Sequence, residues 1–420
     1  MEFTPLEILT ILLGISTACY SAVRKFTKLP LTIGMVMASL AASYGMIGLE
    51  MLFPGSGIRA MVEGIIGSGN FSKIVLEFAL TPLVFATAME VDIDQLKSRW
   101  KSVLVLSTVS VLISTALFGM LLPSAALIVG SSMTVMGALL LGSMQSATDP
   151  VAVNALLKEL PFVPDSLKIK ISGESLVNDG VAVVVYLVML SMAQAAGNAD
   201  LSYSQAGWLF VQEAGGGLVI GGLVAAFIYR WTKAHDEGEL EFLITLFGVL
   251  ILIVVGIRLH VSAPLAALVV GIVIGNWGVR FAMSDTTHQV VHTVWRVIDV
   301  TLNAILFTLI GTVVIIINHD AKHVLFSVAA IAVSLVARFV SVAIPLKLLG
   351  WFTNEKPTKG ATRVLTWGGL RGGILVALAL SLPDTIPGKS YILAGAYGIV
   401  LWTIIVQGLT VKWLILRVVK

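Results

Sequence analysis

The chain has 420 residues, of which 57% are hydrophobic and 12% are charged, and its formal net charge is +3. A soluble domain carries about 25% charged residues, so this composition excludes a soluble protein and indicates one that lies in a membrane. The single cysteine, Cys19, excludes an internal disulfide framework.

Apolar segments long enough to cross a bilayer recur along the whole chain. A spanning helix needs about 20 mostly apolar residues, and the sequence predicts thirteen such spans, which indicates an all-α polytopic membrane protein. Most loops are short, so we expect one membrane domain over 1–420 and no cytosolic regulatory domain. The spans lie near 5–23, 29–50, 71–91, 102–122, 132–158, 169–193, 207–230, 241–257, 262–280, 293–317, 323–348, 361–382 and 390–416.

Basic residues are distributed unevenly between the loops on the two sides. Most Lys and Arg residues follow odd-numbered spans or lie at the C-terminal end, and few lie in the opposite loops. Because cytoplasmic loops carry an excess of basic residues, we expect a multi-pass protein of the cell (inner) membrane. Its N-terminus is expected outside and its C-terminus in the cytoplasm.

Two of the predicted spans contain helix-breaking residues. The fifth span reads SATDPVAV, in which Pro150 lacks an amide hydrogen and disfavours helical geometry at Asp149. We expect Asp149 to cap the half-helix that follows. The twelfth span reads TWGGLRGGILV, in which four glycines flank Arg371 and weaken the helix.

The two breaks are seven spans apart, which predicts an internal repeat. One six-span repeat covers about 5–193, a linking helix lies near 207–230, and the second repeat covers about 241–416. Interrupted helices at matching positions of two halves are typical of the substrate site of a secondary transporter.

The sixth span carries a polar cluster, GESLVNDG, at 173–180. A charge at the middle of the bilayer costs about 2.5–3.5 kcal/mol on insertion scales. At about 100° per residue, Glu174, Ser175, Asn178 and Asp179 fall within roughly 140° of the helix circumference, so this face is expected to meet a cavity or partner helices. Oxygen ligands of this kind suit small hard cations. Asp179 can bind a cation or a proton but not both, and such competition is sufficient for exchange.

These motifs resemble those of a known family. ATDPVAV, GESLVNDG, ARFVSV in the eleventh span and WGGLRGG in the twelfth are similar, in this order, to the NhaP/NHE-type monovalent cation:proton antiporters. The resemblance covers essentially the whole chain. It implies a transporter and not an enzyme, with thirteen helices in two inverted six-helix repeats with discontinuous crossing helices (an NhaA-like antiporter fold). It also implies a homodimer that exchanges Na⁺ or Li⁺ for H⁺ by alternating access, without a cofactor or nucleic acid, in pH homeostasis.

The resemblance implies a role for each residue of the site. Asp179 is the acid that binds the cation and the proton in turn, and Asn178 before it gives the ND form associated with electroneutral exchange. Thr148 and Asp149 line the unwound crossing in the fifth span, and Ser175 is similar to a hydroxyl that assists cation binding. The cation is therefore expected at Asp179, Thr148, Ser175 and Asp149.

Two further charges and one substitution complete the resemblance. Glu174 is expected to form a structural ion pair with Arg338 of the eleventh span, and Arg371 resembles the arginine at the second crossing. The third span reads LTPLVFATAM, in which Thr81 replaces a usual proline and Ala86 stands where many members have an acid. This difference leaves the ion preference open.

Two alternatives remain beside sodium exchange. The motifs are equally compatible with a K⁺/H⁺ antiporter of the same fold. From a different class, an intramembrane aspartyl-type hydrolase would need Asp149 and Asp179 beside one peptide bond. In the tenth span, Arg296 and Asp299 are three residues apart, which predicts a local ion pair.

Overall fold

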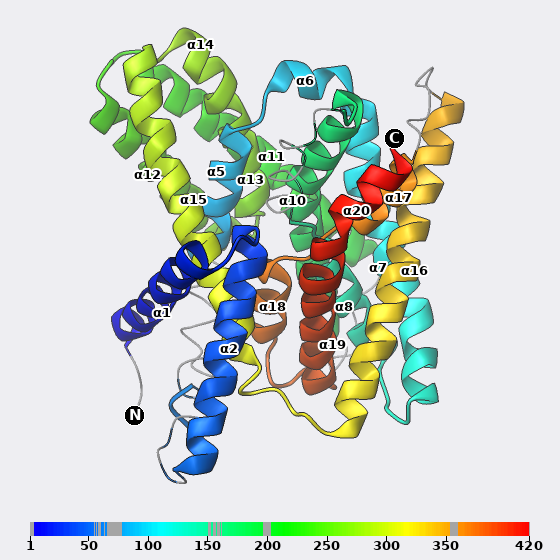
Figure 1. The fold of residues 1–420 in the computed structure, drawn as a ribbon. Helices are drawn as coiled ribbons and strands as arrows, with labels where there is room; N and C mark the ends of the chain where they lie inside the picture. Colours follow the sequence, from blue (N-terminus) through cyan, green and yellow to red (C-terminus); the bar gives the residue numbers. More distant parts are fainter. Residues whose placement is uncertain are drawn as a thin grey trace.

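The computed structural model is built of helices joined by loops in the residues that it describes (Figure 1). The two ends of the chain lie on opposite sides of the molecule in this view. The structure describes residues 4–53, 55, 57, 60–62, 64, 78–149, 153, 157, 160, 162–195, 203–352 and 360–419.

Ten helical runs in this described part are long and apolar enough to cross a membrane. Two of them contain a further helix boundary and a π-helical turn. They are α1 (Pro5–Phe26), α2 (Leu31–Leu52), α7 (Trp100–Ile128), α10 (Asp165–Ala195), α11 (Tyr203–Thr232), α12 (Gly238–Leu259), α13 (Ala263–Val273) with η2 (Ile274–Gly278) and α14 (Val279–Phe281), α15 (Asp285–Val313), α16 (Ala321–Phe352), and α19 (Lys389–Leu401) with η3 (Trp402–Gln407) and α20 (Gly408–Val418).

The three remaining predicted spans, near 71–91, 132–158 and 361–382, contain shorter helices. They correspond to α5 (Leu80–Met89), to α8 (Val135–Ser146), and to the pair α17 (Ala361–Trp367) and α18 (Gly373–Leu380), and the short α6 (Ile93–Ser98) follows α5. The start of the first of these spans and most of the second after Asp149 lie outside the described residues. The all-α polytopic class is confirmed, and every predicted span contains a helix of the structure.

The described helices form two groups that pack mainly within themselves. The first group contains α7, α8, α10 and α16–α20, with α7 packed against both α8 and α16. The second contains α1, α2, α5, α11–α13 and α15, with α13 packed against both α5 and α11. Contacts of α10 with α5 and α13, and of α15 with α18, join the two groups. The residues of the predicted site lie at this junction.

Candidate cation site at the crossing of two broken helices

The break after α8 is held by a backbone hydrogen bond to the second break. Beyond Ser146 the chain becomes extended, with φ −61° and ψ 136° at Ala147. Two residues later the N–H of Asp149 donates to the carbonyl oxygen of Leu370, 2.8 Å away, between α17 and α18. The two interrupted spans therefore cross at their breaks. Pro150 and the half-helix expected after it lie outside the described residues, so capping by Asp149 stays a prediction.

Glycines at the second break allow the chains to approach closely. A Cβ atom added at Gly372 would lie 2.9 Å from Oδ2 of Asp149, and one added at Gly369 would lie 2.6 Å from Nε of Arg338. Both distances are shorter than van der Waals contact. The glycines that predicted a weak helix are therefore also required by packing at the crossing.

Arg371 neutralises the C-terminal end of α8. Its Nη1 donates to the carbonyl oxygens of Ser146 and Ala147 at 3.2 and 2.9 Å, and its side chain is buried. The last carbonyls of a helix have no partner within the helix and carry the negative end of its dipole. The guanidinium supplies both a hydrogen-bond donor and a positive charge. Arg371 therefore stabilises the C-terminal end of α8 at the crossing.

Arg338 has the corresponding position at the end of α17. It forms a two-pronged ion pair with Glu174, in which Nη1–Oε1 is 2.5 Å and Nη2–Oε2 is 3.1 Å. The same Nη2 donates to the carbonyl oxygen of Leu365 at 3.1 Å. Both charged side chains are buried. Glu174 and Arg338 thus form the expected ion pair, and Arg338 also links α17 to α10.

Three polar residues connect the α8 break to α10. Nδ2 of Asn178 donates to Oγ1 of Thr148 at 2.7 Å, and the backbone N–H of Thr148 donates to Oδ1 of Asn178 at 3.4 Å. Oγ1 of Thr148 also lies 2.9 Å from Oγ of Ser175. All three residues are buried. Asn178 therefore holds the break in place, and the two hydroxyls lie next to each other.

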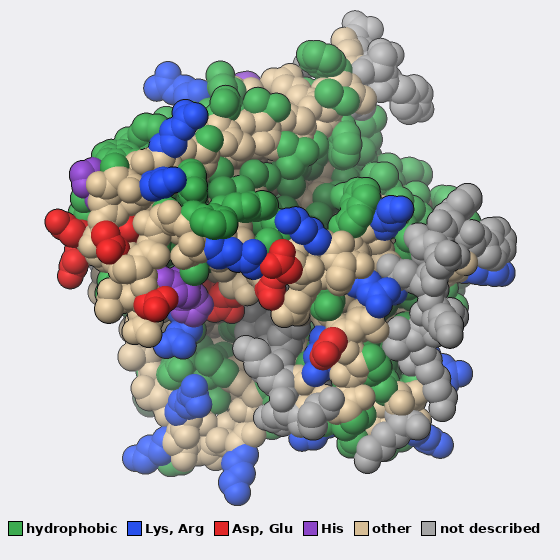
Figure 2. Space-filling view, turned by 90° about the horizontal axis from the view of Figure 1, so that it is seen from above, with side chains coloured by type: hydrophobic (Ala, Val, Ile, Leu, Met, Phe, Trp, Pro, Cys, Tyr) green, Lys and Arg blue, Asp and Glu red, His purple; other side chains and the backbone are tan. Residues whose placement is uncertain are grey.

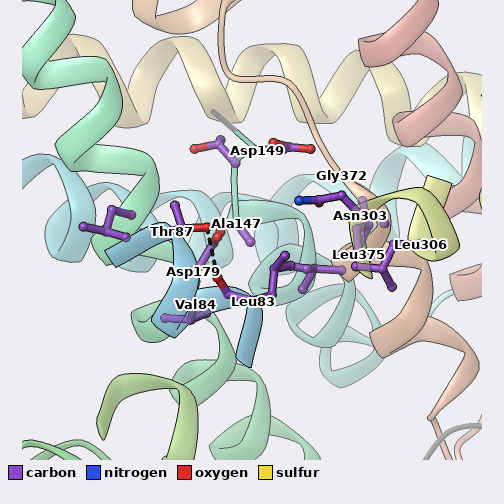
Figure 3. Close-up of a pocket in the computed structure, with 14 residues that line it drawn as sticks. Leu83, Val84, Thr87, Ala147, Asp149, Asp179, Asn303, Leu306, Gly372 and Leu375 are labelled. Atoms are coloured by element: carbon purple, nitrogen blue, oxygen red, sulfur yellow. Dashed lines mark hydrogen bonds between the residues drawn. The ribbon is translucent and has the colours of Figure 1, made fainter. Parts of the chain in front are cut away.

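Asp179 lies beside this cluster and faces a cavity lined by α5, α10, α15 and the two breaks (Figure 3). Its carboxylate interacts with the backbone N–H of Thr148 and electrostatically with Asp149 and Arg371. Thr148 and Asp149 line the same cavity, whereas Ser175 lies behind Thr148. A carboxylate with a hydroxyl and a second carboxylate around one polar space provides the hard oxygen ligands that a small monovalent cation needs.

Two polar residues that line the cavity were not predicted from the sequence. Thr87 of α5 and Asn303 of α15 both line the cavity, and Nδ2 of Asn303 donates to Oδ1 of Asp299 at 3.1 Å. The predicted local pair of Arg296 with Asp299 is wrong, because Arg296 is exposed and Asp299 is bound to Asn303. The sequence signal for this hydrogen bond was the four-residue spacing of Asp299 and Asn303, which places an acid and an amide on one helix face.

The substituted position of the third span does not line the cavity. Ala86 packs in an apolar cluster with Phe85, Met89 and Trp295. The next residue, Thr87, is the nearest polar group that α5 contributes. The helix face that meets the site is therefore that of Leu83 and Thr87.

Comparison with known proteins identifies close relatives over nearly the whole chain. A family model described as sodium/hydrogen exchanger, transmembrane, matches residues 8–417. The Na⁺/H⁺ antiporter NhaP of Pseudomonas aeruginosa is 36% identical over 416 residues, which cover 98% of this chain and 97% of that protein. The low-affinity Na⁺/H⁺ antiporter NhaS1 of Synechocystis is 32% identical, with 98% of this chain and 73% of that protein covered.

A solved structure also shares the fold. The sodium proton antiporter MjNhaP1 from Methanocaldococcus jannaschii superimposes with a TM-score of 0.77. The superposition covers 99% of this chain and 98% of that chain at 19% sequence identity. The architecture is therefore that of a solved antiporter.

Proposed function

Because the chain belongs to the sodium/hydrogen exchanger family, we propose that it is an Na⁺/H⁺ antiporter that works by competition at Asp179. Na⁺ or Li⁺ binds the ionised carboxylate in one half of the cycle, and a proton binds it in the other. The family is one of transporters, so the protein is not an enzyme and the hydrolase alternative is set aside.

The observation that carries the proposal is the position of Asp179 in the cavity at the crossing. Thr148 and Asp149 present further oxygens to the same space. Arg371 occupies the carbonyls of Ser146 and Ala147, so these oxygens are already bound to a fixed cation. The ligands left for a transported ion are side-chain oxygens around one acid.

The other charges of the site support electroneutral exchange. The opposite charges of Glu174 and Arg338 neutralise each other, and the positive charge of Arg371 neutralises the negative dipole end of α8. These groups keep their charge throughout the cycle. Asp179 then carries one Na⁺ in one direction and one H⁺ in the other, so no net charge crosses the membrane.

The arrangement of the helices supports alternating access. The cavity is lined from α5 and α15 of one group and from α10 and the two breaks of the other. Movement of one group past the other would open the cavity to each side in turn. We propose that the second group is the scaffold and that it forms the homodimer, with the C-terminus in the cytoplasm.

The ion preference can be determined by testing Na⁺, Li⁺ and K⁺ in the same transport assay. The relatives named above are called Na⁺/H⁺ antiporters, which favours Na⁺ over the K⁺ alternative. Proteoliposomes that are acidic inside and contain a pH dye should become alkaline on addition of Na⁺ or Li⁺, but not K⁺. The rate should not change when the membrane potential is clamped at zero.

The same assay tests the acid. Asp179→Asn should abolish exchange, whereas Asp384→Asn should leave it unchanged, because the Asp384 side chain is 97% exposed at the protein surface. Full exchange in Asp179→Asn would refute the proposal. A rate that depends on the clamped potential would refute electroneutrality alone.

A further inference from the structure

One acid near the cavity has no part in the exchange cycle described above. Asp299 lies on α15 (Asp285–Val313), one helical turn before the cavity residue Asn303. Its side chain is partly buried, and Oδ1 accepts a hydrogen bond from Nδ2 of Asn303 at 3.1 Å. An ionisable residue inside a membrane span is costly to retain, so it calls for a functional explanation.

The surroundings of Asp299 connect it to the cation site. Thr87 of α5 lies near Asp299 and lines the cavity that Asp179 faces, and its hydroxyl donates to the carbonyl oxygen of Leu83 at 3.0 Å. Asp299 also interacts electrostatically with Asp149 at the site and with Glu90 at the end of α5. Polar and charged groups therefore extend from the end of α5 to the site.

The end of this series of groups that is farthest from the cavity carries two further charged or titratable residues. Glu90 directly follows α5 and is exposed, and its Oε1 lies 3.9 Å from Nε2 of His292 on α15. Figure 2 shows histidine and acidic side chains next to one another on this face of the molecule. Glu90 and His292 therefore lie near the end of α5, and Asp299 has electrostatic neighbours both there and at the site.

We infer that Asp299 is an affinity-determining residue of the entry route, whose negative charge draws the cation toward Asp179 without binding it in the final site. The inference rests on the proposed antiport. The hydrogen bond from Asn303, which itself lines the cavity, holds this carboxylate near the site.

Electrostatic attraction, and not packing, is the physical basis of this role. Clefts lined by charges of one sign focus the field and raise the local concentration of the oppositely charged ion. At effective dielectric constants of about 25 to 50, between those of a protein interior and water, a unit charge acting over ~10 Å changes ion affinity by about three- to tenfold. Such an effect weakens with ionic strength, since the Debye length falls to about 3 Å at 1 M salt.

The test measures the KM for Na⁺ and the maximal rate in proteoliposomes. Asp299→Asn, which keeps the size of the side chain and removes its charge, should raise the KM about three- to tenfold and change the maximal rate less than twofold. Asp299→Glu should restore the KM. Arg296→Gln is the matched control, because Arg296 is an exposed charge one turn away on the same helix, and its KM should equal that of the wild type.

Ionic strength separates attraction from a structural role. Added choline chloride should raise the wild-type KM toward that of Asp299→Asn. An unchanged KM in Asp299→Asn would overturn the inference. A higher KM together with a lower maximal rate would also overturn the inference, if neither Asp299→Glu nor added salt changed these values.

A binding measurement keeps this test separate from that of the transport proposal. The Na⁺ concentration that gives half-maximal thermal stabilisation of the purified protein needs no transport. It should rise by the same factor in Asp299→Asn, and equal midpoints in the two proteins would contradict the inference. Loss of exchange in the wild type, by contrast, would refute the antiport proposal and leave this midpoint to decide the role of Asp299.

Discussion

Glu174→Gln is the perturbation whose effect on stability follows most directly from the structure. The substitution keeps the shape of the side chain but leaves Arg338, which is 6% exposed, with the carbonyl of Leu365 as its remaining described partner. Removal of one member of a buried ion pair costs about 3–5 kcal/mol, because the other charge stays buried without compensation.

The expected thermal shift follows from the size of the chain. An unfolding entropy of about 2.1 cal/mol/K per residue gives 420 residues close to 0.9 kcal/mol per degree, so Tm should fall by about 3–6 °C. The assay is thermal unfolding of the purified protein in one detergent, followed by tryptophan fluorescence. Lys389→Gln is the control, since it removes an ion pair whose acid, Asp384, is 97% exposed, and exposed pairs contribute about 0–1 kcal/mol.

A charge exchange strengthens the test. Glu174→Arg combined with Arg338→Glu restores opposite charges but loses the bond to Leu365, so Tm should recover in part. A Tm of Glu174→Gln equal to that of the wild type would refute the view that this pair holds α10 to α16.

Three further outcomes follow from the site and its surroundings. Gly372→Ala should lower the maximal exchange rate at least about tenfold, because its Cβ would lie 2.9 Å from Oδ2 of Asp149 at the crossing. Thr148→Val should raise the KM for Na⁺ by roughly three- to tenfold through loss of one hydroxyl, a change that matches the net free energy of one hydrogen bond. Hydrogen bonds from the side chains of Ser284 and Thr287 hold the pKa of Asp236 below its ordinary 3.8. A lowered pKa stabilises the folded state above the ordinary value, so Asp236→Asn should lower Tm at pH 7 and lower it less as the pH falls below 4.

Matched variants separate these effects from general damage. Gly48→Ala adds the same methyl group on α2, where no atom lies within 4 Å, and it should leave the exchange rate unchanged. Thr148→Ser keeps the hydroxyl and should keep the KM. A tenfold loss in Gly48→Ala, or a wild-type KM in Thr148→Val, would contradict the geometry on which the expectations rest.

The order of helices and the two breaks could be predicted from the sequence because they depend on local chemistry. Apolar length defines a span, and Pro150 and the glycines around Arg371 interrupt a helix whatever surrounds them. The polar residues of the cluster at 173–180 were predicted to share one helix face, and two of them, Ser175 and Asn178, contact Thr148 at the α8 break.

Contacts between distant segments could not be predicted in this way. The bond from Asp149 to Leu370 and those from Arg371 to the end of α8 depend on how two broken spans cross. The pairing of Glu174 with Arg338 was suggested by family resemblance and not by spacing. Asp299 was misassigned because a three-residue spacing predicts a local pair, whereas packing exposes Arg296 and turns the acid toward Asn303.

The central claim is that one carboxylate, that of Asp179, binds either Na⁺ or a proton. The most direct measurement is proton release from the purified, weakly buffered protein when Na⁺ is added at a pH where the acid is mostly protonated. We expect close to one proton released per Na⁺ bound in the wild type and none in Asp179→Asn. Na⁺ binding without proton release, or equal release in Asp179→Asn, would contradict it.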